Sequence, residues 1–287
     1  MIRYTLVLSF ACFLSSAFAF AEKDISSMDG RELMDHYAKT QTVDSELAFI
    51  EMKTFDSESP SKDVVKRRFL ALTKKKPEGG FDYLIRLVRP KDVEGLSVLT
   101  NVSGDDSVDQ FLYFPAQEKP VKLAGVNRSG AFLGSDFAYE DLIREAPNRN
   151  SYQRLPDGVA QGEVCAVVRA NPEKSAESQY AYRDIYVDPT SFEVRKIVFY
   201  NDDDERIKEL QAYEYRSPDV DGKTVRPRFA VMSNLDRDTI TVFKVLKSRL
   251  NLDIDEQLFS EDYLNQISAA EVNGLLAEID EVEIVQQ

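Results

Sequence analysis

The stretch GAFLGSDFAYEDL, residues 130–142, interrupts a chain that otherwise has the pattern of a β protein. Before and after it, Val, Ile, Tyr and Phe recur at alternating positions, as in half-buried strands. Within it, two glycines bracket Ala-Phe-Leu, and Ser135 or Asp136 is placed to cap a short helical turn that carries Glu140 and Asp141. The stretch contains no pattern of catalytic residues, so it predicts a break between strands and not an active site.

Eleven segments around this stretch have strand patterning, and turn signals separate them. We expect strands at 47–55, 64–73, 81–89, 97–102, 110–114, 162–170, 180–187, 194–200, 207–216, 224–233 and 239–248. Short turns between them favour hairpins, and a sheet of this length must curl or close to cover its apolar face. The sequence therefore predicts a mainly β protein with covering helices, built on a single curved antiparallel sheet.

Helical spacing occurs near both ends of the chain. At residues 29–42, Leu33, Met34 and Tyr37 fall on one face and Asp29 is placed to cap the helix. The region 134–144 is a further candidate for a covering helix. We expect one domain over residues 22–262, followed by an acidic helix or loose tail over 263–287.

Residues 1–21 have the features of a cleaved signal peptide. Arg3 precedes an apolar core at 6–14, and Ala19-Phe20-Ala21 predicts cleavage before Glu22. The apolar run is too short for an uncleaved anchor of about 20 residues, and Cys12 lies inside that core without a good lipobox before it. We therefore expect a soluble mature chain in the periplasm, where Cys165 would be its only cysteine.

The composition is strongly acidic, with 36 Lys and Arg against 50 Asp and Glu and a net charge of −14. Loss of Arg3 with the signal would leave 35 − 50 = −15. Such a chain should repel nucleic acid and anionic headgroups at long range, and we expect no nucleic-acid partner.

The residues for common enzyme chemistry are missing from the sequence. It has a single histidine, His36, and no Gly-x-Ser-x-Gly motif, while Cys165 sits in an apolar strand typical of an inert thiol. The acidic runs at 201–205 and 219–222 lack calcium-loop spacing. We therefore expect no enzyme, no metal and no cofactor, although paired carboxylates for glycoside chemistry remain open. Composition also leaves open whether the sheet encloses a filled core or a ligand cavity.

The 130–142 stretch resembles a Gly-x-x-x-Gly-Ser-Asp-Phe-x-Tyr-Glu-Asp run in one branch of the LolA-like outer-membrane lipoprotein-sorting family. Three further stretches resemble the same family: Lys-Lys-Lys-Pro at 74–77 before Phe-Asp-Tyr-Leu at 81–84, Arg-Pro at 89–90 before 97–101, and Gln-Phe-Leu-Tyr-Phe-Pro at 110–115. The similarity covers roughly residues 45–262. It implies a half-open β-barrel closed by helices, with a hydrophobic cavity for acyl chains. Lys76 stands where the family's carrier has a basic residue that helps to hold a lid, but lysine lacks the fork of arginine.

The resemblance implies a periplasmic carrier that binds lipids or lipoprotein acyl chains and transfers them toward the outer membrane. The alternative is a lipid-sensing or accessory module of an inner-membrane RND-type transporter that does not move cargo itself. Either an RND-type transporter or an outer-membrane acceptor is then an expected partner. The cargo, the partner and the direction of transfer stay open.

Alternation along neighbouring strands suggests which side chains line the cavity. We expect Met52, Phe69, Ile85, Leu87, Phe111 and Tyr113 on its wall, and Phe132, Leu133 and Phe137 closing over it. Gly130 and Gly134 suit the hinges of a movable cover, with Asp136, Glu140 and Asp141 on its wet outer side. The alternative is a fixed turn that plugs the end of the barrel.

Overall fold

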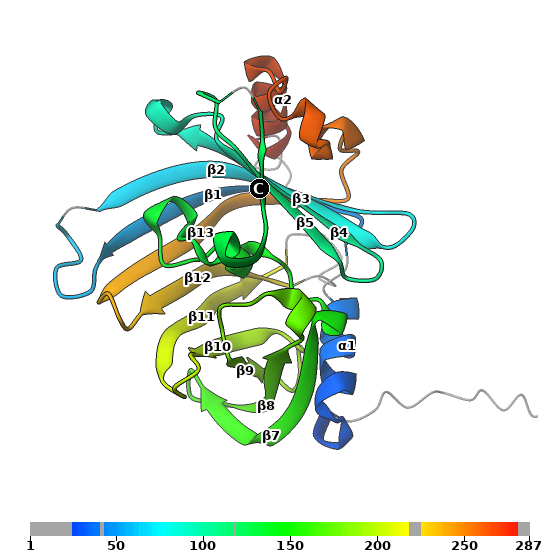
Figure 1. Cartoon of the computed structure of the whole chain (residues 1–287), viewed down its shortest axis with the longest axis vertical. Coiled ribbons are helices and arrows are strands. Elements are labelled where there is room, and N and C mark those ends of the chain that lie inside the picture. The colour runs from blue at the N-terminus through cyan, green and yellow to red at the C-terminus, as the bar shows by residue number, and fades with distance from the viewer. Residues whose placement is uncertain (1–24, 41–42, 63, 118, 218–224, 281–287) are drawn as a thin grey trace, which may run out of the picture.

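The computed structural model describes residues 25–40, 43–62, 64–117, 119–217 and 225–280, so the expected signal peptide lies outside it. One antiparallel sheet of 13 strands curves around a concave face and does not close on itself (Figure 1). The predicted fold class, a single curved antiparallel sheet with covering helices, is confirmed.

The strands follow one another along the chain as neighbours in the sheet. They are β1 (Ser45–Asp56), β2 (Val65–Lys75), β3 (Gly80–Arg89), β4 (Ser97–Ser103), β5 (Val108–Tyr113), β6 (Val121–Leu123), β7 (Asn150–Ala160), β8 (Glu163–Pro172), β9 (Tyr182–Val187), β10 (Val194–Tyr200), β11 (Arg206–Arg216), β12 (Arg226–Asn234) and β13 (Thr239–Leu250). Two meanders, β1–β6 and β7–β13, join where β1 pairs with β13. This order leaves β6 and β7 as the two edges of the sheet.

Two of these strands, β6 and β7, were not expected from the sequence. The strand β6 has only three residues, which is too short to show a period. The strand β7 contains Pro156 and the Asp157-Gly158 pair, which are turn signals, and its pairing with β8 shifts between Leu155 and Gly158. An edge strand tolerates both a proline and a bulge, because one side of its backbone has no strand to pair with.

Two α-helices and several 3₁₀ turns accompany the sheet. The α-helices are α1 (Gly30–Thr40) and α2 (Ala269–Asp280), and the 3₁₀ turns are Ile25–Ser27, Lys91–Val93, Gly125–Ser129, Phe132–Gly134, Glu140–Leu142, Pro147–Arg149, Lys174–Ala176, Glu256–Phe259 and Glu261–Tyr263. The predicted helix at 134–144 is therefore replaced by short turns.

The helix α1 begins with the capping that its sequence predicts. Glu32 N donates to Asp29 Oδ1 at 2.9 Å, and Asp29 N donates to Glu32 Oε2 at 3.0 Å. This reciprocal capping box contributes on the order of 1 kcal/mol. Leu33 and Met34 are fully buried and pack on β8 and β9, so α1 covers the concave face near the β7 edge.

The helix α2 and the turns before it cover the opposite face of β1–β5. Ile279, Leu264 and Phe259 are buried there against strand residues such as Leu84 and Leu99. Burial of each large apolar side chain contributes roughly 1.5–3 kcal/mol. The C-terminal region therefore packs on the sheet as far as Ile279, and residues 281–287 lie outside the described part of the chain.

The chain between the two edge strands crosses the concave face. It leaves β6 at Leu123 and enters β7 at Asn150, and the turns between them lie in front of the sheet (Figure 1). This crossing connection contains residues 130–142, so the stretch that breaks the strand pattern spans the open side of the half-barrel.

Candidate functional site

Residues 130–142, here called the GSDF segment, form a closed loop on the concave face. Phe132 N donates to Phe137 O at 2.7 Å, and Tyr139 N donates to Gly130 O at 3.1 Å. These hydrogen bonds join the two arms of the loop to each other and not to a strand of the sheet. The loop is therefore a small folded unit within the crossing connection.

The tip of the loop needs left-handed backbone angles. Gly134 has φ of +71°, and Leu133 has φ of +53°. Glycine adopts such angles at no steric cost, whereas a residue with a Cβ is disfavoured there. The second glycine of the motif is thus placed at the reversal itself.

The expected capping by Ser135 or Asp136 is wrong. Both side chains are buried, and the turn Glu140–Leu142 has no side-chain cap at its N-terminal residue. Instead, Asp141 Oδ2 accepts a hydrogen bond from Ala138 N at 2.7 Å. The acidic residue inside the turn therefore organises it.

The apolar side of the segment fills the concave face with aromatic rings. The ring of Phe137 stacks on that of Phe243 at 4.1 Å between centroids and 9° between planes. Phe132, which is fully buried, meets Phe69 edge-on at 6.1 Å and Tyr139 at 6.0 Å. Such aromatic pairs add about 0.5–1.5 kcal/mol each beyond the burial of their area.

A buried carboxylate fixes the tip of the segment to β13. Asp136 is 1% exposed; Thr241 Oγ1 donates to its Oδ2 at 2.7 Å, and Thr239 Oγ1 donates to its Oδ1. Asp136 N donates in turn to Thr241 Oγ1 at 3.0 Å, and Arg237 Nη2 lies 3.7 Å from Oδ1. Asp136 is therefore an internal anchor, which corrects its predicted place on a wet outer side.

A second anchor lies at the end of the segment. Tyr180 Oη donates to Asp141 Oδ1 at 2.7 Å, and Lys208 Nζ lies 3.5 Å from Oδ2. Glu140 accepts from Gln179 N at 3.1 Å, and burial, followed by the charge of Asp141, raises the pKa of Glu140. Burial and then Asp141 likewise raise the pKa of Tyr180 well above its ordinary value. Glu140 and Asp141 thus face the protein interior, contrary to the prediction.

Seven of the nine predicted lining residues pack in one apolar cluster on the concave face. They are Met52, Phe69, Ile85, Leu87, Phe132, Leu133 and Phe137. The other two, Phe111 and Tyr113, belong to the cluster under α2 on the opposite face. Their predicted position on the same wall as Ile85 is therefore wrong, whereas acyl-chain binding by the seven stays a prediction.

The pairing register explains this error. Phe111 lies opposite Leu99, and Leu99 lies opposite Leu84, so all three side chains point toward α2. Through the same two ladders, Leu112 is the β5 residue in line with Ile85. A shift of one residue in register moves a side chain to the other face.

Several concave-face residues were not identified from the sequence. They are Val98, Leu112, Phe199, Met232 and Phe243. Each lies in a predicted strand or at its end. Alternation shows which residues of a strand share a face, but it does not show which of the two faces is concave. The partner of Asp136 had no signal in the sequence, because Thr241 is 105 residues away.

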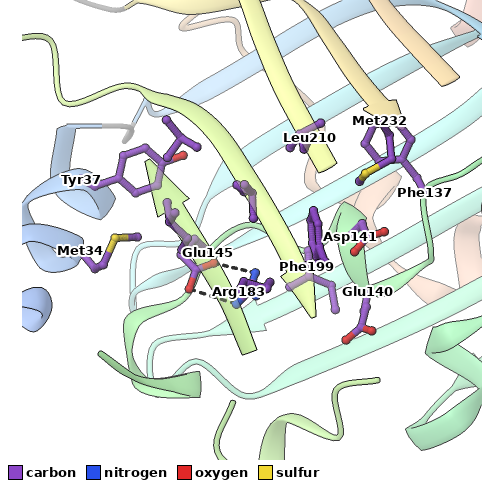
Figure 2. Close-up of a pocket in the computed structure, with 14 residues that line it drawn as sticks. Met34, Tyr37, Phe137, Glu140, Asp141, Glu145, Arg183, Phe199, Leu210 and Met232 are labelled. Carbon is purple, nitrogen blue, oxygen red and sulfur yellow. Dashed lines mark hydrogen bonds and ion pairs between the residues drawn. The ribbon is translucent and has the colours of Figure 1, made fainter. Parts of the chain in front are cut away.

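A cavity of about 100 Å³ lies between the GSDF segment, α1 and strands β9–β12. Figure 2 shows Met34 and Tyr37 of α1 at one side of it and Phe137 with Met232 at the other. Phe199 and Leu210 supply further apolar wall. The volume is well below the roughly 300–1,000 Å³ of typical ligand sites, so in this state the segment occupies most of the concave space.

Charged groups border this small cavity as well. Arg183 Nη1 pairs with Glu145 Oε2 at 3.0 Å (Figure 2), and Glu145 also accepts from Tyr152 Oη at 2.6 Å. Burial opposes the charge of Arg183, but Glu145 together with Tyr152, Glu140 and Asp141 outweighs burial, so the pKa of the guanidinium is raised. Burial raises the pKa of Tyr37 to about 12. The arginine is thus charged and the tyrosine neutral at ordinary pH.

Three other residues singled out in the sequence lie away from the segment. Lys76 Nζ pairs with Asp82 Oδ1 at 3.0 Å on neighbouring β3, so it does not reach the segment as a latch. Cys165 is buried in β8, and burial raises the pKa of its thiol. The His36 ring packs on that of Phe192 at 4.0 Å between centroids. Within the described ranges, no three His, Cys, Asp or Glu side chains are grouped to hold a metal ion.

A search of curated proteins gives no match to this chain. A family model with the description "Uncharacterized protein"-like matches residues 79–266, which is more than half of the chain. The chain belongs to that family. Among the helices in the described ranges, none is long and apolar enough to cross a membrane.

Solved structures show which fold this family member has. An outer membrane lipoprotein-sorting protein domain from Vibrio parahaemolyticus is 23% identical, with 82% of this chain and 98% of that chain covered and a TM-score of 0.74. A DUF1329 family protein from Desulfovibrio piger is 19% identical, with 82% and 97% covered and a TM-score of 0.75. A LolA superfamily protein from Nitrosomonas europaea is 18% identical, with 83% and 100% covered and a TM-score of 0.64. The predicted resemblance is confirmed at the level of the fold, which is LolA-like.

Proposed function

We propose that this protein is a periplasmic carrier that binds lipids or lipoprotein acyl chains on the concave face of its half-barrel. One observation carries the proposal: the apolar wall of the sheet is covered by a separate loop, and the sheet itself does not close. Removal of the GSDF segment would expose Phe69, Leu87 and Met232, which are now buried. A contiguous apolar wall of this kind suits an acyl chain.

The build of the GSDF segment supports its role as a movable cover. Its arms are hydrogen-bonded to each other, so the loop can leave the sheet without losing its own fold. Gly134 at its tip has a left-handed backbone that glycine adopts without steric cost. Gly130 at its start has ordinary extended angles here, and as a glycine it can also adopt others. We infer that loading requires this loop to swing away, because the cavity of about 100 Å³ is too small for an acyl chain.

Export and transfer complete the proposal. The signal-like residues 1–21 support a periplasmic location, and the sorting-protein name of the Vibrio neighbour supports transfer toward the outer membrane. An RND-type inner-membrane transporter or an outer-membrane acceptor would then exchange cargo with the carrier. No enzymatic step is part of the proposed function.

The alternative is a lipid-sensing or accessory module that holds its ligand without shuttling it. The two buried anchors favour this alternative. Asp136 ties the GSDF segment to Thr241 of β13, and Asp141 ties it to Tyr180, just before β9. A firmly held segment would slow exchange of cargo. The rate of loading therefore separates the two functions.

A reversible lock on the GSDF segment tests the carrier. Asp136 and Thr241 are in direct side-chain contact, so the double variant Asp136→Cys with Thr241→Cys in a Cys165→Ala background should form a disulfide between segment and sheet. We expect the reduced protein to take up and release a fluorescent fatty-acyl probe and the oxidised protein to do so at least tenfold more slowly. Cys165→Ala alone, treated with the same oxidant, is the control.

The outcomes are distinct. Equal exchange in both forms would show that the segment does not gate the site. Saturable binding with slow exchange, even in the unlocked wild type, would support the accessory module. No saturable binding by any form would overturn acyl-chain binding altogether.

A further inference from the structure

A row of polar side chains crosses the concave face of β1–β5, beside the apolar cluster. Pairing places one residue of each strand directly opposite the next across the ladders. The members of this row are Glu46, Thr73, Tyr83, Thr100 and Gln110. They alternate with residues that pack under α2, so their side chains share the face of Ile85 and Leu112.

Three buried polar atoms at this row have no hydrogen-bond partner among the described residues. They are Tyr83 Oη, Gln110 Oε1 and Arg144 Nη2. Native proteins leave few such atoms unpaired, because each costs on the order of 1–3 kcal/mol. Burial raises the pKa of Tyr83 to about 12, although the neighbouring Arg144 lowers it in part, so the hydroxyl keeps its proton. Of the three atoms, Tyr83 Oη and Arg144 Nη2 carry hydrogens to donate, whereas Gln110 Oε1 is an amide oxygen that only accepts.

These donors border a pocket of about 250 Å³ at the end of the GSDF segment. Its polar lining comprises Glu46, Thr73, Tyr83, Asp141, Arg144 and Arg226. Both carboxylates have partners already: Glu46 Oε2 lies 3.3 Å from Arg226 Nε, and Asp141 is held by Tyr180 and Lys208.

Arg144 is the uncompensated charge of this pocket. Its guanidinium carbon lies 4.9 Å from the ring centroid of Phe81, and the ion pairs of the described residues include none with Arg144. This cation–π contact with Phe81 holds the guanidinium in place without using its N–H groups as hydrogen-bond donors. A fixed guanidinium with adjacent hydroxyl donors is the arrangement that binds an oxyanion.

We propose that this pocket, with Arg144 and the Tyr83 hydroxyl as its donors, binds a phosphate-type oxyanion at the polar end of the cargo. The inference rests on the proposed carrier function and deepens it, because it makes the cargo an anionic amphiphile. The pocket shares Asp141 and Ile143 with the small cavity beside Phe137. A molecule with its headgroup at Arg144 can therefore extend its acyl chain directly into the space under the GSDF segment.

The acidic character of the whole chain does not oppose this site. The net charge of −14 is spread over 287 residues, and its field is screened beyond about 8–10 Å at physiological ionic strength. Inside a partly buried pocket, the nearest unpaired charge decides the interaction. Long-range repulsion would slow the approach of an anionic lipid without preventing its binding.

Binding of two lipids that differ only in the phosphate tests the inference. Dioleoyl phosphatidic acid and dioleoylglycerol, each presented as a cyclodextrin complex, should bind the full mature protein with affinities that differ about tenfold or more. Arg144→Gln should remove this preference while leaving dioleoylglycerol binding unchanged. Arg206→Gln is the control, since it removes one exposed positive charge of β11 outside the pocket.

A second variant separates recognition from folding. Tyr83→Phe deletes a buried hydroxyl that has no partner, so the ligand-free protein should melt at the same or a higher temperature. The same variant should weaken phosphatidic acid binding several-fold. A role in folding alone would lower the melting temperature and leave the preference between the two lipids intact.

The results that overturn the inference are specific. Equal affinity for the two lipids, or a preference that survives in Arg144→Gln, removes the headgroup site but keeps the carrier. Inorganic phosphate that binds alone as tightly as phosphatidic acid, and is lost in Arg144→Gln, would make this a site for free phosphate. If neither lipid binds, the carrier proposal fails and the headgroup site fails with it.

Discussion

Asp136 Oδ2 and Thr241 Oγ1 are 2.7 Å apart, and both residues are buried. This contact joins the tip of the GSDF segment to the first residues of β13, across 105 residues of sequence. Burial of a carboxylate costs free energy unless hydrogen-bond donors surround it. Here two threonine hydroxyls donate to Asp136. The acidic residue of the Gly-Ser-Asp-Phe run therefore has a structural task, which is to hold the segment against the sheet.

Removal of one of these hydroxyls should loosen the segment. Thr241→Val keeps the shape of the side chain but takes a donor from Asp136, so we expect a loss of about 1–3 kcal/mol in the free energy of unfolding. Hydrogen exchange over residues 130–142 should rise more than elsewhere. Thr54→Val is the control, because Thr54 Oγ1 contacts Thr241 Oγ1 at 3.0 Å while none of its own hydrogen bonds reaches Asp136. Equal exchange in the two variants would contradict the anchor.

Truncation of Phe137 should lower the stability of the protein and at the same time increase ligand uptake. Phe137→Ala removes the ring that stacks on Phe243 and leaves a cavity, which costs about 3–5 kcal/mol in typical cores. The same cavity enlarges the space of about 100 Å³ beside it. We therefore expect a lower melting temperature together with tighter or faster uptake of a fluorescent acyl probe. If uptake falls along with stability, Phe137 is part of the binding wall and not of its cover.

The two faces of the sheet can be told apart with one kind of substitution. Ile85→Lys places a charge on the concave face, and Phe49→Lys places it on the face under α2. Both residues are half-buried, so both variants should lose stability. Only Ile85→Lys should weaken the acyl probe, by at least tenfold. A comparable loss in Phe49→Lys would mean that the ligand lies under α2, where Phe111 and Tyr113 also pack.

The sequence predicted the architecture because alternation and turn residues are local signals. It placed Met52, Phe69, Ile85 and Leu87 on one face correctly, since a strand's own pattern shows which residues share a side. It failed for Phe111, whose face depends on the register of two hairpins.

Non-local contacts account for the other differences. Ser135 and Asp136 are residue types that commonly cap a helix at the surface, yet both are buried. The contacts that hold Asp136 inside come from distant Thr239 and Thr241. The strand β7 was missed because Pro156 is a turn signal unless the strand lies at an edge. The Arg144 pocket is lined by residues of β1, β2, β3, β12 and the crossing connection. These segments are far apart in the sequence, so no local pattern predicts that they meet.

The last prediction concerns Glu51, which lies on the face opposite the GSDF segment and tests the sheet independently of any ligand. Its side chain is 7% exposed and contacts Lys66 Nζ at 2.9 Å, Arg68 Nη2 at 3.0 Å and Lys53 Nζ at 3.3 Å. Burial opposes its ionisation, but hydrogen bonds from Lys66, Arg68 and Lys53 outweigh burial and lower the pKa from 4.5 to about 2. Because the pKa is lower in the folded state, the contribution to stability is complete above pH 4.5 and is lost as the pH falls toward 2.

Glu51→Gln should therefore destabilise the protein at pH 7 and matter progressively less in acid. The shift corresponds to about 3 kcal/mol, but the three cations are 40–48% exposed, so screening by solvent reduces the expected loss to about 1–2 kcal/mol. Urea unfolding of wild type and variant at pH 7, 5 and 3.5 measures it. The exposed Glu58→Gln, in the turn after β1, should change stability by less than about 0.5 kcal/mol at each pH. A loss in Glu51→Gln that is the same at pH 7 and 3.5 would show that packing, and not the charge on this carboxylate, holds β1 to β2.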